Sequence, residues 1–258
     1  MSISSLIVDG SGNGFKAQVT KDNALKVIST DPEVVGEIVI GKISTSSVSL
    51  AKVLGTTYTE QSSNAQRSVA SNNVNDVQGG TGAQSIKITY FTQFFEGPRE
   101  EIVLLNGTTF VPTQNNDICY IQNIKVVSAD SGNTNAGIIS LFVNNSGDGG
   151  TIGTIAVADT QTFWGHYYVG GGQKINILAV TCGSDTNLSG YFLLKSKLPN
   201  QPEIQITENI FITTSGSIIR PIVAPIILKG PIKIISYIKP SSASGANWFS
   251  SFDVRLFL

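Results

Sequence analysis

The chain has 258 residues, of which 41% are hydrophobic, so it can bury a sizeable core and is not a disordered chain. Only 14% of its residues are charged, and 17 Lys and Arg against 18 Asp and Glu give a formal net charge of −1. This balance argues against nucleic-acid binding, which requires a concentrated basic face, and it permits close self-association.

The residue types favour β-structure. Gly, Ser, Thr, Asn, Ile and Val dominate, whereas Met and His each occur once. Branched side chains are stiff at χ1 and pack well on pleated surfaces, and Asn, Ser and Gly favour turns. No apolar run reaches membrane-spanning length, so we expect no membrane partner. The composition predicts an all-β protein.

Residues 1–60 differ from the rest of the chain. A Gly- and Asn-rich turn at residues 10–14 precedes strand-like segments at residues 15–19 and 24–28, and EIVIGKISTSSVSL (residues 37–50) suggests another strand. Such a segment buries too little surface to stay ordered alone. We therefore predict an N-terminal arm or small β subdomain that docks on a neighbouring molecule.

Residues 61–198 show short strands with turn signals at near-regular spacing, which is typical of a sandwich or barrel. The segment SIKITY (residues 85–90) alternates apolar and polar residues, and Asn106-Gly107 is a pair favoured in type I′ hairpins. The long apolar segment DICYIQNIKVVSA suggests a β-bulge between Tyr120 and Ile124. We predict that this region forms a central β-sandwich.

Residues 199–258 are again rich in strand-like segments, after a break marked by Pro199 and Pro202. The last residues alternate, with Phe252, Val254, Leu256 and Leu258 on one face. We predict that this segment either completes the sandwich or forms a small second unit.

The stretch VQGGTGAQSIKITY (residues 77–90) is either a phosphate-binding loop or a turn that precedes a strand. A phosphate-binding loop needs a Lys after its last glycine and a helix beyond it. Here Gly82 is followed by Ala83-Gln84 and a strand-like run, so the motif favours a structural turn. The glycine runs at residues 10–14 and 170–172 have the same interpretation.

His166 is the single histidine and lies in the aromatic segment FWGHYYV, where a half-buried strand residue is the favoured interpretation. One histidine with two distant cysteines does not make a zinc site, so Cys119 and Cys182 are predicted to be small buried side chains.

The carboxylates are scattered. Glu100 and Glu101 point to opposite faces of a strand, so they are no acid–base pair. Asp130 and Asp148 lie in loops that match no calcium-binding pattern. We therefore name no catalytic, cofactor-binding or metal-binding residue, and a β-sandwich hydrolase is the weakest alternative because it lacks a visible constellation.

A receptor- or carbohydrate-binding module is the stronger alternative. It needs aromatic side chains at a surface, and the sequence offers Trp164 with Tyr167 and Tyr168, or Trp248 with Phe249.

Several segments resemble virion proteins of tailed bacteriophages. The similar elements are Asn75-Asp76 followed by Gly80-Thr81-Gly82-Ala83, the run Leu105 to Thr109, and the run Asn135 to Ile138. The opening LIVDGSGNGFKAQVTKDNALKV is also similar to the N-termini of phage structural proteins. The resemblance covers most of residues 62–195, with Val169-Gly170-Gly171 where such proteins often have Val-Pro-Gly.

This resemblance implies a jelly-roll-like β-sandwich present in repeated copies, and it carries over no catalytic residue or cofactor. The expected function is that of a non-enzymatic structural protein of the virion, assembled in the host cytoplasm. A capsid decoration or head-fibre protein is favoured, and a tail, baseplate or collar component with a receptor- or carbohydrate-binding role is the alternative. The expected partners are copies of itself, as a homotrimer or higher ring, and the major capsid protein or tail and baseplate components.

Overall fold

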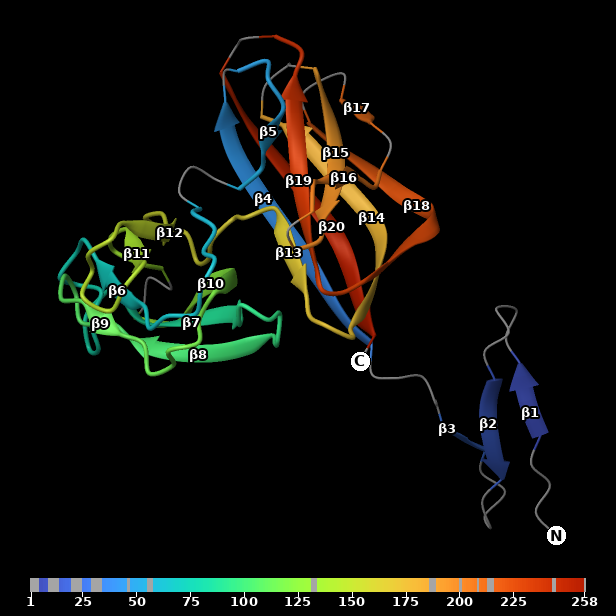
Figure 1. Ribbon diagram of the computed structural model, residues 1–258, viewed down its shortest axis with the longest axis horizontal. Coiled ribbons are helices and arrows are strands. Elements are labelled where there is room, and N and C mark those ends of the chain that lie inside the picture. The colour runs from blue at the N-terminus through green and yellow to red at the C-terminus, as the bar shows by residue number, and fades with distance from the viewer. Residues whose placement is uncertain are drawn as a thin grey trace. The chain divides into compact units, whose positions relative to one another are not determined.

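The computed structural model describes residues 5–8, 14–19, 25–28, 34–45, 47–54, 58–130, 134–185, 189–199, 201–207, 209–212, 216–242 and 245–257. All regular structure in these residues is β-strand, which confirms the prediction of an all-β protein (Figure 1). Within them, no helix is long and apolar enough to span a bilayer. The chain divides into two compact units, one of residues 1–35 with 257–258 and one of residues 36–256.

The first unit contains one small antiparallel sheet. Strands β1 (Ser5–Val8), β2 (Gly14–Val19) and β3 (Leu25–Ile28) lie in that order, and β2 and β3 confirm the two strands predicted at residues 15–19 and 24–28. The predicted turn at residues 10–14 lies mostly outside the described residues.

The second unit contains a jelly roll. One of its sheets has the order β18-β14-β20-β4, and the other has the order β13-β19-β15, with β16 and β17 beside β15 and β5 beside β19. The strands are β4 (Val34–Thr45), β5 (Ala51–Lys52), β13 (His166–Val169), β14 (Lys174–Ser184), β15 (Gly190–Lys197), β16 (Ile204–Gln205), β17 (Ile210–Ile212), β18 (Gly216–Lys229), β19 (Ile232–Pro240) and β20 (Ala246–Phe257).

The strand order identifies this fold without reference to other proteins. The first strand, β4, lies beside the last, β20, and β13 lies beside β19. Further in, β14 pairs with β18 and β15 with β17, all antiparallel. Strands early in the jelly-roll chain therefore pair with strands late in it, and strands in the middle pair with each other. This nested pairing is the topology of a double-sheet jelly roll.

A second sandwich is inserted between β5 and β13 of the jelly roll (Figure 1, teal through green to yellow-green). It has a sheet of order β10-β7-β8 and a sheet of order β12-β11-β6-β9. Its strands are β6 (Ser68–Ser71), β7 (Ala83–Phe91), β8 (Arg99–Leu104), β9 (Val111–Pro112), β10 (Tyr120–Ala129), β11 (Ile139–Phe142) and β12 (Thr151–Ile155).

Each sandwich has its own hydrophobic core. The jelly-roll core includes Trp248, and the alternation predicted for the last strand places Phe252, Val254 and Leu256 in it, while Leu258 lies outside the described residues. The core of the inserted sandwich includes Trp164. Each core thus contains one of the two tryptophans of the chain.

The structure divides the strands differently from the predicted ranges. Strands β13, β14 and β15 fall within the predicted central sandwich of residues 61–198, yet they share sheets with β18, β19 and β20 of the segment 199–258. Strands β4 and β5, within the predicted arm of residues 1–60, also belong to the jelly roll. Alternating strands read alike in both sandwiches, so the pattern does not reveal which sheet a strand joins.

Of the predicted bulge and the predicted hairpin, the structure contains the bulge but not the hairpin. The bulge expected in the long apolar strand is confirmed, because the register of β10 against β7 shifts between Ile121 and Asn123. The expected hairpin at Asn106-Gly107 is wrong: β8 pairs with β7 and β9 pairs with β6, so this turn carries the chain from one sheet to the other. Gly107 has a φ of 60°, and its N–H donates to the carbonyl of Asp76 at 2.8 Å.

The side chain of Asp76 is fully buried and saturated with hydrogen bonds. Its Oδ1 accepts the backbone N–H groups of Ala83 and Ala136, both at 2.8 Å, and its Oδ2 accepts that of Gly137 at 2.9 Å. The Ser71 hydroxyl donates to the same carboxylate. One side chain therefore joins the end of β6, the start of β7 and the segment before β11.

The buried Asp76 carboxylate explains why the turn before β7 is rich in glycine. A Cβ on Gly82 would lie 2.2 Å from Oδ1 of Asp76, and a Cβ on Gly80 would lie 2.4 Å from the carbonyl oxygen of Asn75. The chain must pass close to the buried carboxylate before it enters β7, and only glycine permits that approach. The interpretation of the motif as a structural turn holds in this geometry.

We expect Asp76→Ala to destabilise the protein by about 3 kcal/mol or more, because it leaves three buried backbone N–H groups without their acceptor. Asp148→Ala is the matched control, since Asp148 is exposed and accepts a surface hydroxyl from Ser146. Urea unfolding followed by circular dichroism measures both. Equal stability of the two variants would show that Asp76 does not hold the sandwich together.

Candidate functional site

The glutamates and cysteines singled out in the sequence are placed as their strand positions predict. The two glutamates do point to opposite faces: Glu100 is exposed and pairs with Lys87 at 2.8 Å, whereas Glu101 is buried and accepts two backbone N–H groups. Cys119 and Cys182 are both buried, as predicted. Across the described part of the chain, no three His, Cys, Asp or Glu side chains come together in a way that would hold a metal ion.

His166 is more deeply buried than predicted, with 1% of its surface exposed. Its Nε2 lies 2.9 Å from the carbonyl oxygen of Ile121, and the rings of Tyr58, Trp164 and Tyr168 surround it. Burial, assisted by the positive charge of Lys233, lowers the pKa of His166 well below its usual range. The imidazole is therefore neutral and structural.

The aromatic residues expected for a carbohydrate site are also buried. Trp164, Tyr167, Tyr168 and Trp248 are each at most 6% exposed, and Phe249 is half-buried. Side chains inside a core present no ring face to a sugar. The sequence-based location of a glycan site is therefore wrong.

A buried lysine lies instead at the junction of the two sandwiches. Lys233, on β19, is 2% exposed, and its Nζ is 3.2 Å from Oε2 of Glu60. The rings of Tyr58 and Tyr168 each lie 5.0 Å from Nζ, within the range of cation–π attraction. Burial lowers the pKa of Lys233 to about 8, although Glu60 opposes the shift.

Hydrogen bonds connect this lysine to both sandwiches. The hydroxyls of Tyr58 and Tyr168 are 2.7 Å apart, and the Tyr168 hydroxyl donates to Oε1 of Glu60 at 3.4 Å. The backbone N–H of Tyr168, on β13, donates to Oε1 of Gln122, on β10, at 2.8 Å. The junction is thus a connected polar network within an aromatic environment.

A cleft of about 420 Å³ opens beside Lys233. Its walls include Glu60 and Tyr120, the end of β15 at Lys197, and the turn between β7 and β8 at Phe94 and Phe95. The ring of Phe94 is 70% exposed, and Phe95 has a φ of 59°, an unusual backbone conformation for a bulky residue.

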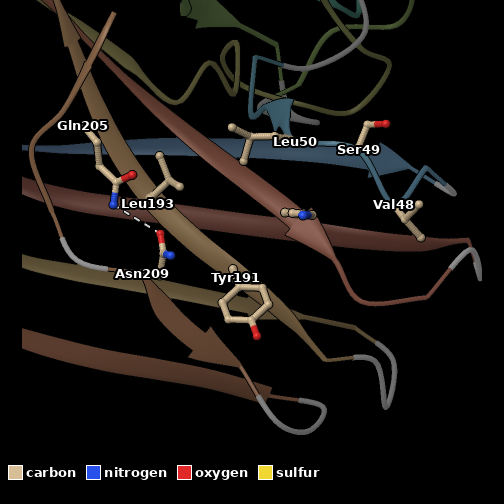
Figure 2. A pocket seen from close by; sticks show the side chains of 8 residues that line it. Val48, Ser49, Leu50, Tyr191, Leu193, Gln205 and Asn209 are labelled. Atoms are coloured by element: carbon tan, nitrogen blue, oxygen red, sulfur yellow. Dashed lines mark hydrogen bonds between the residues drawn. The ribbon is translucent and has the colours of Figure 1, made fainter.

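A second, larger groove of about 740 Å³ lies on the jelly roll, where the connection from β4 to β5 faces β15 and the segment from β16 to β17 (Figure 2). Tyr191 lines it, half-exposed and 4.9 Å from the ring of Phe211. Gln205 donates to Oδ1 of Asn209 at 3.2 Å. Lys239 supplies its one cationic side chain.

The sequence analysis did not single out Lys233, Glu60 or Tyr58. The sequence does contain one indication of this site, a lone lysine within the apolar run PIKIISYI. A charged side chain on a buried strand requires a partner. The partner comes from a segment more than a hundred residues earlier in the chain, so no local pattern identifies it.

No protein-family model matches the chain, and a comparison with curated proteins found no match. Among solved structures, T=1 particles derived from infectious bursal virus share 10% sequence identity and a TM-score of 0.26, over 100% of this chain and 68% of that chain. A mutant VP2 protein of infectious bursal disease virus shares 9% identity with a TM-score of 0.29, over 99% of this chain and 68% of that chain. The jelly-roll assignment rests on strand order and not on these distant similarities.

The burial of His166 predicts a pH dependence of stability. Below the unfolded-state pKa of about 6.5, the unfolded chain binds a proton that the folded chain does not, so stability falls as the pH decreases. Between pH 7 and pH 5.5 we expect a loss of about 1 kcal/mol in the free energy of unfolding. His166→Gln should lack this loss when urea unfolding is measured at both pH values; parallel behaviour of the two proteins would contradict the prediction.

Proposed function

We propose that this chain is a non-enzymatic structural protein of a tailed-bacteriophage virion, and more specifically a capsid decoration or head-fibre protein. The observation that carries the proposal is the position of the residues that resemble such virion proteins. The resembling segments meet at Asp76. Its carboxylate accepts N–H groups from Ala83 and from Ala136 and Gly137, and its backbone carbonyl accepts that of Gly107 in the Leu105 to Thr109 turn. The resemblance therefore lies in residues that build the sandwich and not in a catalytic site.

Exposed apolar residues on sheet edges support assembly with further copies of the chain, which we propose to be a homotrimer or higher ring. Strands β4 and β18 are the two edges of one jelly-roll sheet. Ile38 on β4 and Ile227 on β18 are each 63% exposed. Unpaired edges with apolar side chains invite pairing with another chain, and a symmetric assembly covers them.

The three-stranded sheet of β1, β2 and β3 supports the proposed docking role. Its strands are four to six residues long, and it forms a compact unit of its own. A sheet of this size gains little stability by itself, so packing on a partner would stabilise it. We propose the major capsid protein, met during assembly in the host cytoplasm, as that partner.

The alternative is a tail, baseplate or collar component with a receptor- or carbohydrate-binding role. The cleft beside Lys233 and the groove at Tyr191 favour it, because a lattice protein has no need of a ligand site. Copy number separates the two functions: hundreds of copies per particle indicate decoration, and a few to tens indicate a fibre, collar or baseplate.

Antibody-gold labelling of intact virions, viewed by electron microscopy, tests the proposal. We expect gold over the head. Gold at the tail would favour the alternative, and absence from both intact and disrupted particles would refute a role in the virion.

Deletion of residues 1–33 tests the docking role. This deletion leaves β4 intact, whereas a deletion to residue 60 would remove the first jelly-roll strand. We expect a folded protein, by circular dichroism, that no longer incorporates into particles assembled in infected cells. Incorporation at the level of the full chain would contradict docking through this segment.

A further inference from the structure

We propose that the cleft beside Lys233 binds an acidic saccharide, a sugar that carries a carboxylate such as a sialic or uronic acid. In this arrangement the ammonium groups of Lys197 and Lys233 contact the carboxylate, and Phe94 packs against the sugar ring. This inference goes beyond the structural role in the virion and does not depend on it.

The charges that line the cleft favour an anion. Lys197 and Lys233 occupy directly opposed positions in the antiparallel pairing of β15 with β19. Like charges in such a pair destabilise a sheet, and Lys197 contributes to the lowered pKa of Lys233. Among the described residues that line the cleft, Glu60 supplies the one carboxylate, so it offsets only one of the two positive charges.

Lys233 retains hydrogen-bonding capacity toward the cleft. An ammonium group has three donors, and among the contacts of the described residues Nζ has one carboxylate oxygen as its ion-pair partner, that of Glu60. Because water is largely excluded around this side chain, an added carboxylate would interact with it more strongly than at an exposed surface. A carboxylate ligand would satisfy the remaining donors.

The aromatic wall is exposed and held in place. The N–H of Phe95 donates to the carbonyl of Thr92 at 3.0 Å, and the carbonyl of Phe95 accepts the N–H of Gly171 at 3.1 Å. The ring of Tyr120 packs on Phe95 at 4.5 Å between centroids. Left-handed backbone at a bulky residue costs energy and concentrates at ligand-binding sites. Here it places the Phe94 ring at the rim of the cleft, where the apolar face of a sugar can pack.

Three polar residues of the lining suit the hydroxyl groups of a sugar, beside the apolar Leu198 and Pro199. Gln61, Ser62 and Gln93 contribute amides and a hydroxyl to the wall. Gln93 uses its Oε1 to accept the N–H of Asn64 at 3.3 Å, which orients its NH₂ group as a donor. A volume of about 420 Å³ lies within the range of small-molecule sites and accommodates a mono- or disaccharide. A bare inorganic anion would use neither the aromatic wall nor the amides.

The test is a titration of the full chain, followed by saturation-transfer NMR, with N-acetylneuraminic acid and glucuronic acid as probes and galactose and glucose as neutral counterparts. We expect the acidic sugars to bind at least about tenfold more tightly than the neutral ones. Phe94→Ala and Lys197→Gln should each weaken that binding about tenfold. Both substitutions spare the buried network, so circular dichroism should show an unchanged fold.

Tyr191→Ala and Lys239→Gln are the matched controls, because they remove an aromatic ring and a lysine from the second groove (Figure 2). They should leave the affinity unchanged. The proposal would be overturned if neutral and acidic sugars bound with equal affinity, or if only the control variants lost binding. It would also be overturned if an equal concentration of inorganic phosphate displaced the sugar and Phe94→Ala had no effect. The absence of binding at millimolar sugar would overturn it as well.

Discussion

The buried carboxylate of Asp76 is the constraint on which the inserted sandwich depends. A charge inside a protein is tolerated only when hydrogen bonds replace its water, and here three backbone N–H groups and one hydroxyl do so. At the other end of β6, the buried Arg67 guanidinium donates to the carbonyls of Ser63 and Ile118. Strand β6 is thus fixed at both ends by buried charges bonded to backbone, which defines its register within a sheet whose strands are short.

The jelly roll accommodates the inserted sandwich because its strand pairing is nested. β5 and β13 each pair with β19, so lengthening the connection from β5 to β13 disturbs no hydrogen-bonded ladder. The entropic cost of a longer connection grows only with the logarithm of its length. Contacts between His166 and Ile121 and between Tyr168 and Gln122 then tie β13 to β10.

Sequence patterns correctly predicted those features that depend on residues close together in the chain. The alternation of Phe252, Val254 and Leu256, the bulge in β10 and the turn before β7 depend on neighbouring residues, and each was found. Sheet membership depends on pairing with distant strands, so the division into two sandwiches was missed and Asn106-Gly107 was mistaken for a hairpin. His166 was predicted to be half-buried because strand alternation cannot show that a second sandwich covers its outer face.

The same insertion explains why the candidate cleft had no signature in the sequence. Glu60, Phe94, Tyr120, Lys197 and Lys233 come from five separate segments of the chain, which only the joining of the two sandwiches brings together. The paired lysines, the left-handed Phe95 and the exposed Phe94 each oppose folding stability. Their concentration in one cleft, away from the exposed edge residues Ile38 and Ile227, is difficult to attribute to packing. The proposed assembly through strand edges and the proposed recognition at the junction of the two sandwiches together account for both sets of features.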